Sequence, residues 1–394
     1  MSRTVENGVD GQSAHYVWKV YPFTGARALV TCFYPVTARR VGEEMIETLQ
    51  DKILSWDGES VVVVYDQPTG TWIFIAIHNT TLGVASGGTR MKSYDSPVAG
   101  LVDALRLAEG MTYKWAGVGM SFGGGKAVLA VPDRLSARER DGLLDRYAER
   151  LKSLQGAFQT GVDMGTTPED MIRIGAISGH AVGVKEGQSA DPGPYTALGV
   201  FVGMRAALNY HFGSESFESR SVLIQGLGDV GLPLVDRLKA AGAHLFVSDI
   251  DGAVVAKTVE ETGATAVALD AVYDMPVDIY APCAVGATLN PNTISRLKCA
   301  IVAGSANNQL QSSSDAEALQ ERGILYAPDY VINAGGAVAF GHIHQGERDE
   351  RQLEAAVEKI ETALHDIFAE ADKQGDLPSR VAHRRAKRFL DEQS

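Results

Sequence analysis

Hydrophobic and polar positions follow two different rhythms along the chain. Before about residue 190, amphipathic stretches with helical spacing are mixed with short β-rich runs. This part predicts a strand-like segment from Tyr16 to about Val36, helices at 40–56, 97–116 and 136–153, and strands at Val61–Tyr65, Trp72–Ile77 and Ala127–Val131. A strand is also expected immediately before Asp163.

After residue 190 the rhythm changes. A proline-rich entry leads into a predicted helix at 194–211, which indicates a linker into a second domain. Short β-branched strands then alternate with alanine-rich helices, and the strands are expected at Val222–Gln225, His244–Ser248, Ile279–Ala281 and Ala300–Ala303. Such alternation predicts an α/β domain with a doubly wound parallel sheet and helices on both of its faces.

One long amphipathic helix is predicted near the C-terminus. Its apolar positions are spaced by four, three, four and three residues, at Leu353, Val357, Ile360, Leu364 and Ile367. Such a stripe has to be buried against another part of the protein. We expect the C-terminal helices, residues 341–394, to return and pack on the first domain.

Charge and composition narrow the possible partners. The formal net charge of −13 argues against a nucleic-acid-binding protein, because phosphate contacts require a basic surface. A basic tail between Arg380 and Arg388 is interpreted as the solvated face of a terminal helix. No apolar run approaches the roughly 20 residues of a membrane span, and the first residues do not resemble a signal peptide. Three cysteines without metal spacing fit a cytoplasmic protein that binds no metal.

A glycine motif marks a dinucleotide site in the second domain. Gly226, Gly228 and Gly231 follow a predicted strand and open a helix, and Asp229 and Val230 lie between them. These glycines allow a tight turn, close approach of a pyrophosphate, and tight helix–strand packing. The next strand ends at Asp249, 23 residues after the first glycine, where a carboxylate can bind both ribose hydroxyls and repel a 2′-phosphate. The motif therefore predicts a Rossmann domain that binds NAD rather than NADP.

Two lysines and one aspartate carry candidate chemistry in the first domain. Lys114 lies near a helix end, Lys126 closes what we interpret as a glycine-rich loop, and Asp163 is flanked by glycines. Burial or a neighbouring cation lowers the pKa of a lysine, as a lysine general base requires. An ATP-binding loop is excluded, because Met120 and Ala127 replace the glycine and the Ser/Thr that such a loop needs.

These segments together resemble the glutamate/leucine/phenylalanine/valine dehydrogenase family, and most closely its leucine dehydrogenase branch. The similarity covers about residues 60–375. The matching motifs are His78–Gly83, Gly87–Met91, Met111–Lys114, Gly123–Lys126, Asp163–Thr167, Ile279–Cys283, Ala306–Gln309 and Tyr326–Gly336. The resemblance implies reversible, NAD-dependent oxidative deamination of a hydrophobic L-amino acid to its 2-oxo acid and ammonia. It also implies a homo-oligomer.

The resemblance also implies roles for individual residues. Lys114 would bind the substrate α-carboxylate, Lys126 would activate water, and Asp163 would exchange protons with ammonia. The further positions implied are Gly87 and Gly88 lining the cleft, Thr196 and Asn307 positioning the nicotinamide, and Asn333 contacting substrate or cofactor. The implied cycle is hydride transfer from Cα to NAD, hydration of the imine, and collapse to the products, with no metal.

The substrate pocket departs from the leucine dehydrogenase pattern. Positions that match the family's side-chain pocket hold Ser86, Gly161, Ala337 and Phe340. The first three are small and enlarge the pocket, whereas the large side chain of Phe340 narrows it again. Either a branched-chain or an aromatic substrate side chain is therefore expected to fit. The pocket contains no charged residue, and this argues against glutamate as the substrate.

The expected architecture is a substrate-binding and assembly domain over 1–190 and an NAD domain over 191–340, with the active site in the cleft between them. Residues 1–46 form an extra N-terminal segment without a predicted role. Two alternatives remain. A non-catalytic NAD-binding regulator would need none of Lys114, Lys126 and Asp163, and a 2-hydroxy-acid dehydrogenase would use a histidine base that these motifs lack.

Overall fold

A computed structural model describes residues 4–5, 16–17, 29–33, 42–185, 188–189, 191–347 and 349–393 of the chain. The chain forms two compact units. Unit 1 comprises residues 1–116, 121–190 and 393–394, and unit 2 comprises residues 117–120 and 191–392. Most of the expected segment 1–46 lies outside the described residues, apart from β1 (Thr4–Val5), β2 (Tyr16–Val17), β3 (Leu29–Phe33) and the start of the first helix.

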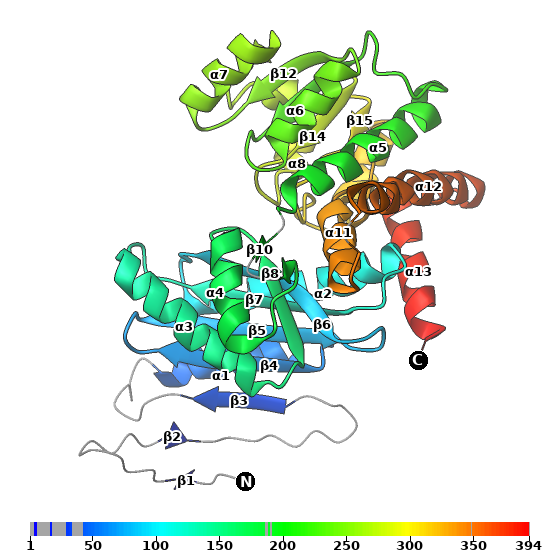
Figure 1. Cartoon of the computed structure of the whole chain (residues 1–394). Helices are drawn as coiled ribbons and strands as arrows, with labels where there is room; N and C mark the ends of the chain where they lie inside the picture. Colours follow the sequence, from blue (N-terminus) through cyan, green and yellow to red (C-terminus); the bar gives the residue numbers. More distant parts are fainter. Residues whose placement is uncertain are drawn as a thin grey trace. The chain divides into compact units, whose positions relative to one another are not determined.

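Unit 1 is built on a mixed six-stranded sheet with the order β3-β4-β5-β7-β6-β8 (Figure 1). Strands β4, β5 and β7 are antiparallel neighbours, whereas β6 is parallel to both β7 and β8. At the other edge β3, from the extra N-terminal segment, pairs in parallel with β4. The strands are β4 (Ser60–Asp66), β5 (Thr71–Asn79), β6 (Ala85–Lys92), β7 (Gly123–Ala130) and β8 (Phe158–Val162).

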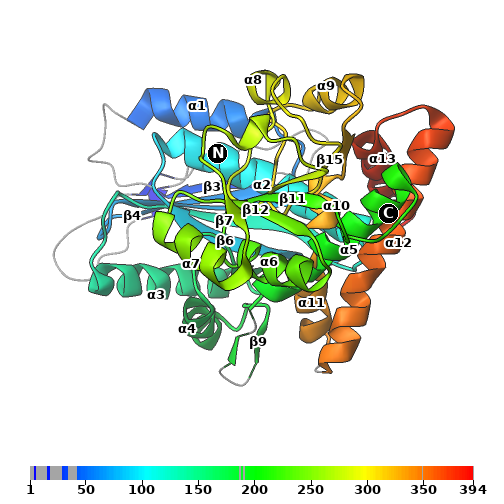
Figure 2. The same ribbon diagram turned by 90° about the horizontal axis from the view of Figure 1, so that it is seen from above.

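Helices cover both faces of this sheet, as Figure 2 shows. On one face α1 (Gly42–Leu54) and α2 (Pro97–Gly117) enclose a core with Phe74 and Val128. On the other face α3 (Ala137–Ser153) and α4 (Pro168–Ser178) enclose a second core. Two of these helices begin with a capping box, which fixes their first turns. A small hairpin, β9 (Val184–Lys185) with β10 (Gln188–Ser189), follows α4.

The predicted glycine-rich loop before Lys126 is in fact the beginning of strand β7. A side chain at Gly124 would meet Thr112 Oγ1 at 1.9 Å, and one at Gly125 would meet the ring of Phe158 at 2.8 Å. These glycines therefore let helix α2 and strand β8 pack tightly against β7. The loop prediction was wrong because close packing, and not a turn, requires the glycines.

Unit 2 contains the predicted parallel sheet, with the order β13-β12-β11-β14-β15-β16. The chain reverses its direction of winding between β11 and β14, the position where doubly wound sheets bind ligands. Its strands are β11 (Ser221–Gln225), β12 (His244–Ser248), β13 (Thr265–Ala266), β14 (Ile279–Pro282), β15 (Ile301–Val302) and β16 (Leu325–Tyr326).

Helices pack on both faces of the parallel sheet. One face meets the larger core, to which α5, α6, α10, α11, α12 and α13 contribute, and the other meets a core with residues of η1, α8 and α9. The helices are α5 (Gly193–Phe212), α6 (Gly231–Ala240), α7 (Gly252–Thr262), the 3₁₀ helix η1 (Val272–Asp274), α8 (Pro291–Ile294), α9 (Asp315–Glu321), α10 (Asp329–Ile332), α11 (Gly335–His344), α12 (Glu350–Gln374) and α13 (Pro378–Asp391).

The C-terminal helices fall within unit 2. The buried stripe of α12 packs against α5, beside which it runs in Figure 1. Helix α5 offers a wide apolar surface, including Val200, Met204 and Leu208, and this surface covers the stripe. None of the helices within the described residues is both long enough and apolar enough to cross a membrane.

Candidate active site

The main cluster of buried charges in unit 1 lies where β6, β7 and β8 run side by side. Lys126 projects from the middle of β7 with its side chain 5% exposed, and Asp163 immediately follows β8 with its side chain 12% exposed. The Lys126 ammonium forms a short ion pair with Asp163 Oδ2. The structure therefore brings together the two residues predicted to be catalytic.

The loop that carries Asp163 is fastened to strand β6. The Met91 amide donates to Met164 O at 2.8 Å, and the Thr166 hydroxyl donates to Thr89 O at 2.9 Å. Gly165 has a φ of +80°, and a side chain there would meet Met91 O at 1.8 Å. The close fit of this loop to β6 fixes where the Asp163 carboxylate lies.

Arg90 completes the cluster. It lies within the matching motif Gly87–Met91, but the resemblance gave roles only to Gly87 and Gly88 of that motif. The Arg90 Nε donates to Asp163 Oδ1 at 2.9 Å, and Arg90 Nη1 donates to Asp103 Oδ2 at 3.0 Å. Its position two residues after Gly88, on the same strand, was the available sequence signal. The three side chains of Lys126, Asp163 and Arg90 form one buried ionic network.

This network shifts the pKa of both residues that are predicted to be catalytic. Burial lowers the pKa of Lys126, and the positive charge of Arg90 lowers it further, against the opposing effect of Asp163. Burial alone would raise the pKa of Asp163, but the charges of Lys126 and Arg90 outweigh burial and hold that pKa well below its usual range. The site thus combines a lysine that loses its proton more easily than usual with an aspartate that stays ionised.

The predicted glycines on β6 and β8 make room for these groups. A side chain at Gly88 would meet Val162 O at 2.6 Å and Asp163 Cβ at 2.7 Å, and one at Gly87 would meet Gly125 O at 1.9 Å. A side chain at Gly161 would meet Val182 Cγ2 at 3.0 Å. This contact is tight, but it is with a side chain and not with the backbone. Only glycine at 87 and 88 permits this spacing of the backbone and the Asp163 carboxylate.

Two further predicted residues lie in unit 1. Lys114 is in the last turn of α2 and is 9% exposed, and Ser86 is buried on β6. The next residue of α2, Trp115, donates from its indole to Ser86 O at 3.1 Å. This bond ties the end of α2, and with it the backbone of Lys114, to the strand that carries Ser86 and Arg90.

The predicted dinucleotide loop of unit 2 depends on its glycines. Gly226 has a φ of +108°, and a side chain at Gly231 would overlap Gly226 O at 1.9 Å, so both positions need glycine. At Gly228 a side chain would meet nothing within 4 Å, which leaves its backbone facing open space. Asp249 immediately follows β12, and its Oδ2 accepts from the Leu227 amide at 2.7 Å. The carboxylate is thus held beside the loop.

A second polar group of unit 2 gathers around Asn333. This side chain is 4% exposed, and its amide donates to Ser305 O and to Asn307 Oδ1, both at 3.0 Å. Its own Oδ1 is buried without a hydrogen-bond donor. Two of the predicted residues, Asn333 and Asn307, are therefore in contact and present a buried acceptor.

Thr196 and the two pocket positions of unit 2 lie on α5 and α11. Thr196 Oγ1 donates to Pro192 O at 2.9 Å and accepts from the Gly336 amide at 3.2 Å, which ties α5 to the start of α11. Ala337 and Phe340 are three residues apart on α11 and so share a face of that helix. Ala337 is half-buried, and Phe340 is buried.

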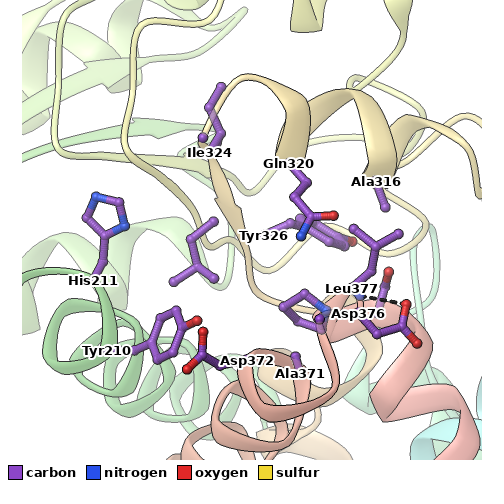
Figure 3. A pocket seen from close by; sticks show the side chains of 15 residues that line it. Tyr210, His211, Ala316, Gln320, Ile324, Tyr326, Ala371, Asp372, Asp376 and Leu377 are labelled. Carbon is purple, nitrogen blue, oxygen red and sulfur yellow. Dashed lines mark hydrogen bonds between the residues drawn. The ribbon is translucent and has the colours of Figure 1, made fainter.

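A hollow of about 250 Å³ lies elsewhere in unit 2, between the end of α5, strand β16 and the turn from α12 to α13 (Figure 3). Of its lining residues, Tyr210, His211 and Asp372 are exposed to solvent, whereas Tyr326 is buried. Its lining contains none of the residues predicted for substrate or cofactor.

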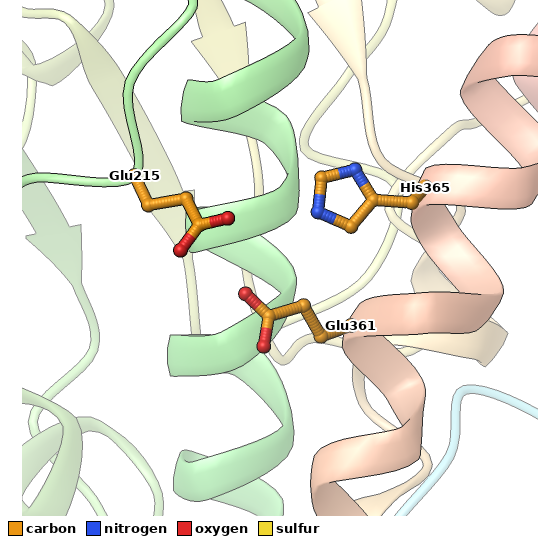
Figure 4. Close-up of side chains that lie close together, drawn as sticks. All are labelled: Glu215, Glu361 and His365. Atoms are coloured by element: carbon orange, nitrogen blue, oxygen red, sulfur yellow. The ribbon is translucent and has the colours of Figure 1, made fainter.

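Glu215, Glu361 and His365 approach one another on unit 2, with ligand atoms within 4.8 Å (Figure 4). The guanidinium of Arg205 lies 3.1 Å from Glu361 and 3.5 Å from Glu215. Because Arg205 already supplies the positive charge between the carboxylates, we interpret this cluster as an ion-pair network and not as a metal centre.

Comparison with known protein families gives two matches. The model for the Glu/Leu/Phe/Val dehydrogenase dimerisation domain matches residues 65–176, and the Glutamate/Leucine/Phenylalanine/Valine dehydrogenase model matches residues 256–386. Together the two matches include Lys114, Lys126, Asp163 and the polar group around Asn333.

Individual proteins give the same result. Leucine dehydrogenase of Bacillus subtilis (strain 168) is 41% identical over 329 residues, which are 83% of this chain and 89% of that protein. Phenylalanine dehydrogenase of Lysinibacillus sphaericus is 40% identical over 345 residues, 85% of this chain and 89% of that protein. The crystal structure of L-tryptophan dehydrogenase from Nostoc punctiforme superposes with a TM-score of 0.72 at 38% identity, covering 87% of this chain and 99% of that one.

Proposed function

The chain belongs to the glutamate/leucine/phenylalanine/valine dehydrogenase family and is an amino-acid dehydrogenase acting on the CH–NH₂ group, and we propose that it converts hydrophobic L-amino acids to 2-oxo acids with NAD. The observation that carries this proposal is the buried ion pair of Lys126 and Asp163. A protein that only binds NAD has no use for such a pair, which is costly to bury. This argues against the alternative of a non-catalytic regulator.

Lys126 and Asp163 divide the proton transfers between them. Lys126, with its lowered pKa, takes a proton from the water that attacks the imine carbon of the substrate. Asp163, which is ionised in the resting site, exchanges protons with the amino nitrogen as ammonia forms. Lys114, buried at the end of α2, binds the substrate carboxylate through a charge-assisted hydrogen bond.

The glycine loop of unit 2 fits a nicotinamide dinucleotide, which when bound accepts a hydride from the substrate Cα. The amide groups at the start of α6, next to the open space at Gly228, are suited to the pyrophosphate. The Asp249 carboxylate beside this loop would accept hydrogen bonds from the ribose hydroxyls and disfavour a 2′-phosphate, which favours NAD over NADP. The buried Oδ1 of Asn333 offers an acceptor for the nicotinamide amide, with Asn307 and Thr196 nearby in the same unit.

For the substrate side chain we propose contacts with Ser86 and Gly161 of unit 1 and with Ala337 and Phe340 of unit 2, the positions that match the family's pocket. The relatives act on leucine, phenylalanine and tryptophan, according to their names. Small residues at three of these four positions leave room for a bulky side chain, and none of the four is charged. We therefore expect branched-chain and aromatic amino acids as substrates, and not glutamate.

The protein is proposed to work as a homo-oligomer in the cytoplasm. The family model that matches residues 65–176 describes a dimerisation domain, and the Thermus thermophilus glutamate dehydrogenase, which shares the fold at 21% identity, is hetero-hexameric. Light scattering of the purified chain gives its mass in solution, and a monomer would contradict the proposed assembly.

The experiment that tests the function follows NADH absorbance with NAD and a panel of L-amino acids, and in reverse with ammonia and 2-oxo acids. Wild-type protein is compared with Lys126→Ala and with Lys152→Ala, which removes an exposed lysine of α3. We expect turnover with hydrophobic substrates, lost only in Lys126→Ala. Absence of turnover in both directions with every substrate would contradict the proposal and favour the regulator.

A further inference from the structure

A chain of charged side chains continues behind the catalytic pair. Arg90 links two carboxylates, because one guanidinium nitrogen contacts Asp163 and another contacts Asp103. The Arg90 side chain is 11% exposed and that of Asp103 is 9% exposed. Tyr94 donates its hydroxyl to the same Asp103 oxygen at 2.7 Å. A buried guanidinium held at both ends has almost no freedom to rotate.

This arrangement determines which Asp163 oxygen faces Lys126. Asp163 Oδ1 is taken by Arg90 Nε and by the Met164 amide at 2.7 Å, which leaves Oδ2 for Lys126. Without Arg90, the carboxylate could rotate and offer either oxygen. The fork of an arginine, with donors fixed in one plane, is suited to this task, whereas a lysine has a single donor group.

We propose that Arg90, fixed by Asp103 and Tyr94, is a positioning residue that orients the Asp163 carboxylate and sets the charge balance around Lys126. The proposal rests on the proposed function, because it assigns Arg90 a role in the deamination reaction. Arg90 acts through Asp163 and Lys126 and does not itself contact the reacting atoms.

The charges around Lys126 come from each neighbouring element. Strand β6 supplies Arg90, the loop after β8 supplies Asp163, and helix α2 supplies Asp103, whose other oxygen contacts Arg106 at 3.3 Å. Arg90 lowers the pKa of Lys126, whereas Asp163 and Asp103 raise it.

Two more cations lie on elements of the same region. Lys114 is eleven residues after Asp103 on α2, about 16 Å along the helix. Arg140 of α3 donates to Gly165 O near the Asp163 loop, but its charge is balanced by a two-pronged ion pair with Asp170. Arg90 and Asp103 are the members of the ion-pair network next to the Lys126–Asp163 pair, so they are the groups to change.

The test uses two substitutions with opposite expected effects on the pH dependence of kcat/KM. Lys126 acts as a base in its neutral form, so activity falls on the acid side as Lys126 becomes protonated. Arg90→Met removes a positive charge that lowers the pKa of Lys126. The acid limb, which is the fall of kcat/KM at low pH, should therefore move up by about 1 pH unit. Asp103→Asn removes a negative charge and should move the limb down by a smaller amount.

Matched controls separate this effect from a general loss of stability. Arg146 and Asp66 form another two-pronged ion pair in unit 1, with Asp66 buried. Asp66 pairs with Thr71 on β5 and Lys126 pairs with Ala76, five residues further, which places the control about 17 Å away. Arg146→Met and Asp66→Asn should reduce stability and leave the acid limb where it is in the wild-type protein.

A conservative variant separates charge from orientation. Arg90→Lys keeps the positive charge but loses the fork, so the acid limb should stay near that of the wild type while kcat falls by about tenfold or more, with KM for the amino acid changed less. Wild-type kcat in Arg90→Lys would overturn the positioning role. Because this variant preserves the buried charge, it also provides a folded protein if Arg90→Met does not fold.

A measurement that does not depend on turnover distinguishes this inference from the proposed function. The pH dependence of acetylation of Lys126 by acetic anhydride, quantified by peptide mass spectrometry against exposed Lys152, reports the pKa of Lys126 directly. Opposite shifts in Arg90→Met and Asp103→Asn would support the network even if no dehydrogenase activity were found. Shifts in the same direction, an unchanged titration, or equal shifts in the Arg146 and Asp66 controls would overturn the inference.

Discussion

Replacement of Asp249 by asparagine isolates the charge that we assign to cofactor choice. Asp249 Oδ2 accepts from the Leu227 amide at 2.7 Å and Oδ1 accepts from the Asp251 amide at 2.9 Å. An asparagine keeps one of these bonds through its single oxygen and occupies the same volume. The loop between β11 and α6 should therefore keep its shape, because Gly226 and Gly231 are fixed by their own packing.

The size of the effect follows from Coulomb's law. Asp249 is half-buried at the end of β12, so an effective dielectric constant between that of the protein surface and that of water applies. Two unit charges 4 Å apart repel by about 4 kcal/mol at a dielectric constant of 20 and about 1 kcal/mol in water. A middle value of about 2 kcal/mol corresponds to a change of roughly 30-fold in the preference for NAD over NADP.

The assay compares kcat/KM for NAD and NADP in the wild-type protein and in Asp249→Asn, with a saturating amino-acid substrate. We expect the wild type to prefer NAD and the variant to lose most of this preference, chiefly through improved use of NADP. Screening by salt should narrow the difference in the wild type. If the wild type used NADP as well as NAD, or if the variant kept the full preference, the role given to Asp249 would be refuted.

Three further predictions concern the site and the core. In Gly161→Ala the new methyl group meets Val182 at 3.0 Å, so we expect a loss of about 1 kcal/mol in stability and a shift of kcat/KM towards smaller substrates; an unchanged substrate profile would remove Gly161 from the pocket. In Asp163→Asn the free energy of unfolding at neutral pH should fall by about 3 kcal/mol, because Lys126 and Arg90 lose their counter-charge. The depressed pKa of Asp163 means that this stabilisation is present above the ordinary aspartate pKa of about 4 and is lost as the pH falls, so urea unfolding of the two proteins should converge in acid. In Leu364→Ala a fully buried side chain between α12 and α5 is truncated, so urea unfolding should show a loss of about 2–5 kcal/mol with kcat nearly unchanged, and a stable variant would contradict the packing described.

Much of the fold follows from local patterns. The strand at His244–Ser248 and the helices near 97–116 and 136–153 were predicted within a few residues, because period and capping are properties of neighbouring residues. The glycine segment before Lys126 was misinterpreted for the opposite reason. Whether a glycine permits a turn or close packing depends on what lies beside it, and here Thr112 and Phe158 come from other elements.

The candidate site shows the same division. Motifs identified Lys126 and Asp163, because both stand in segments that match the family pattern, Gly123–Lys126 and Asp163–Thr167. Arg90 was missed as a participant, since nothing in the order of residues says that it reaches both Asp163 and Asp103. Its role follows from the parallel register of β6 and β8, which aligns Gly88 with Gly161 and so brings Arg90 next to Asp163.

By itself the sequence determined the class of the protein, with two α/β units, and it pointed to a candidate dinucleotide loop with an acidic partner and to a candidate lysine and aspartate for proton transfer. Tertiary structure alone decided where the C-terminal helices pack, which neighbours make Lys126 a weaker base, and which oxygen of Asp163 faces it. The physical reason is that propensity and spacing act over a few residues. Burial and ion pairing depend instead on side chains that lie far apart in the chain, and these meet only when the sheets and helices assemble.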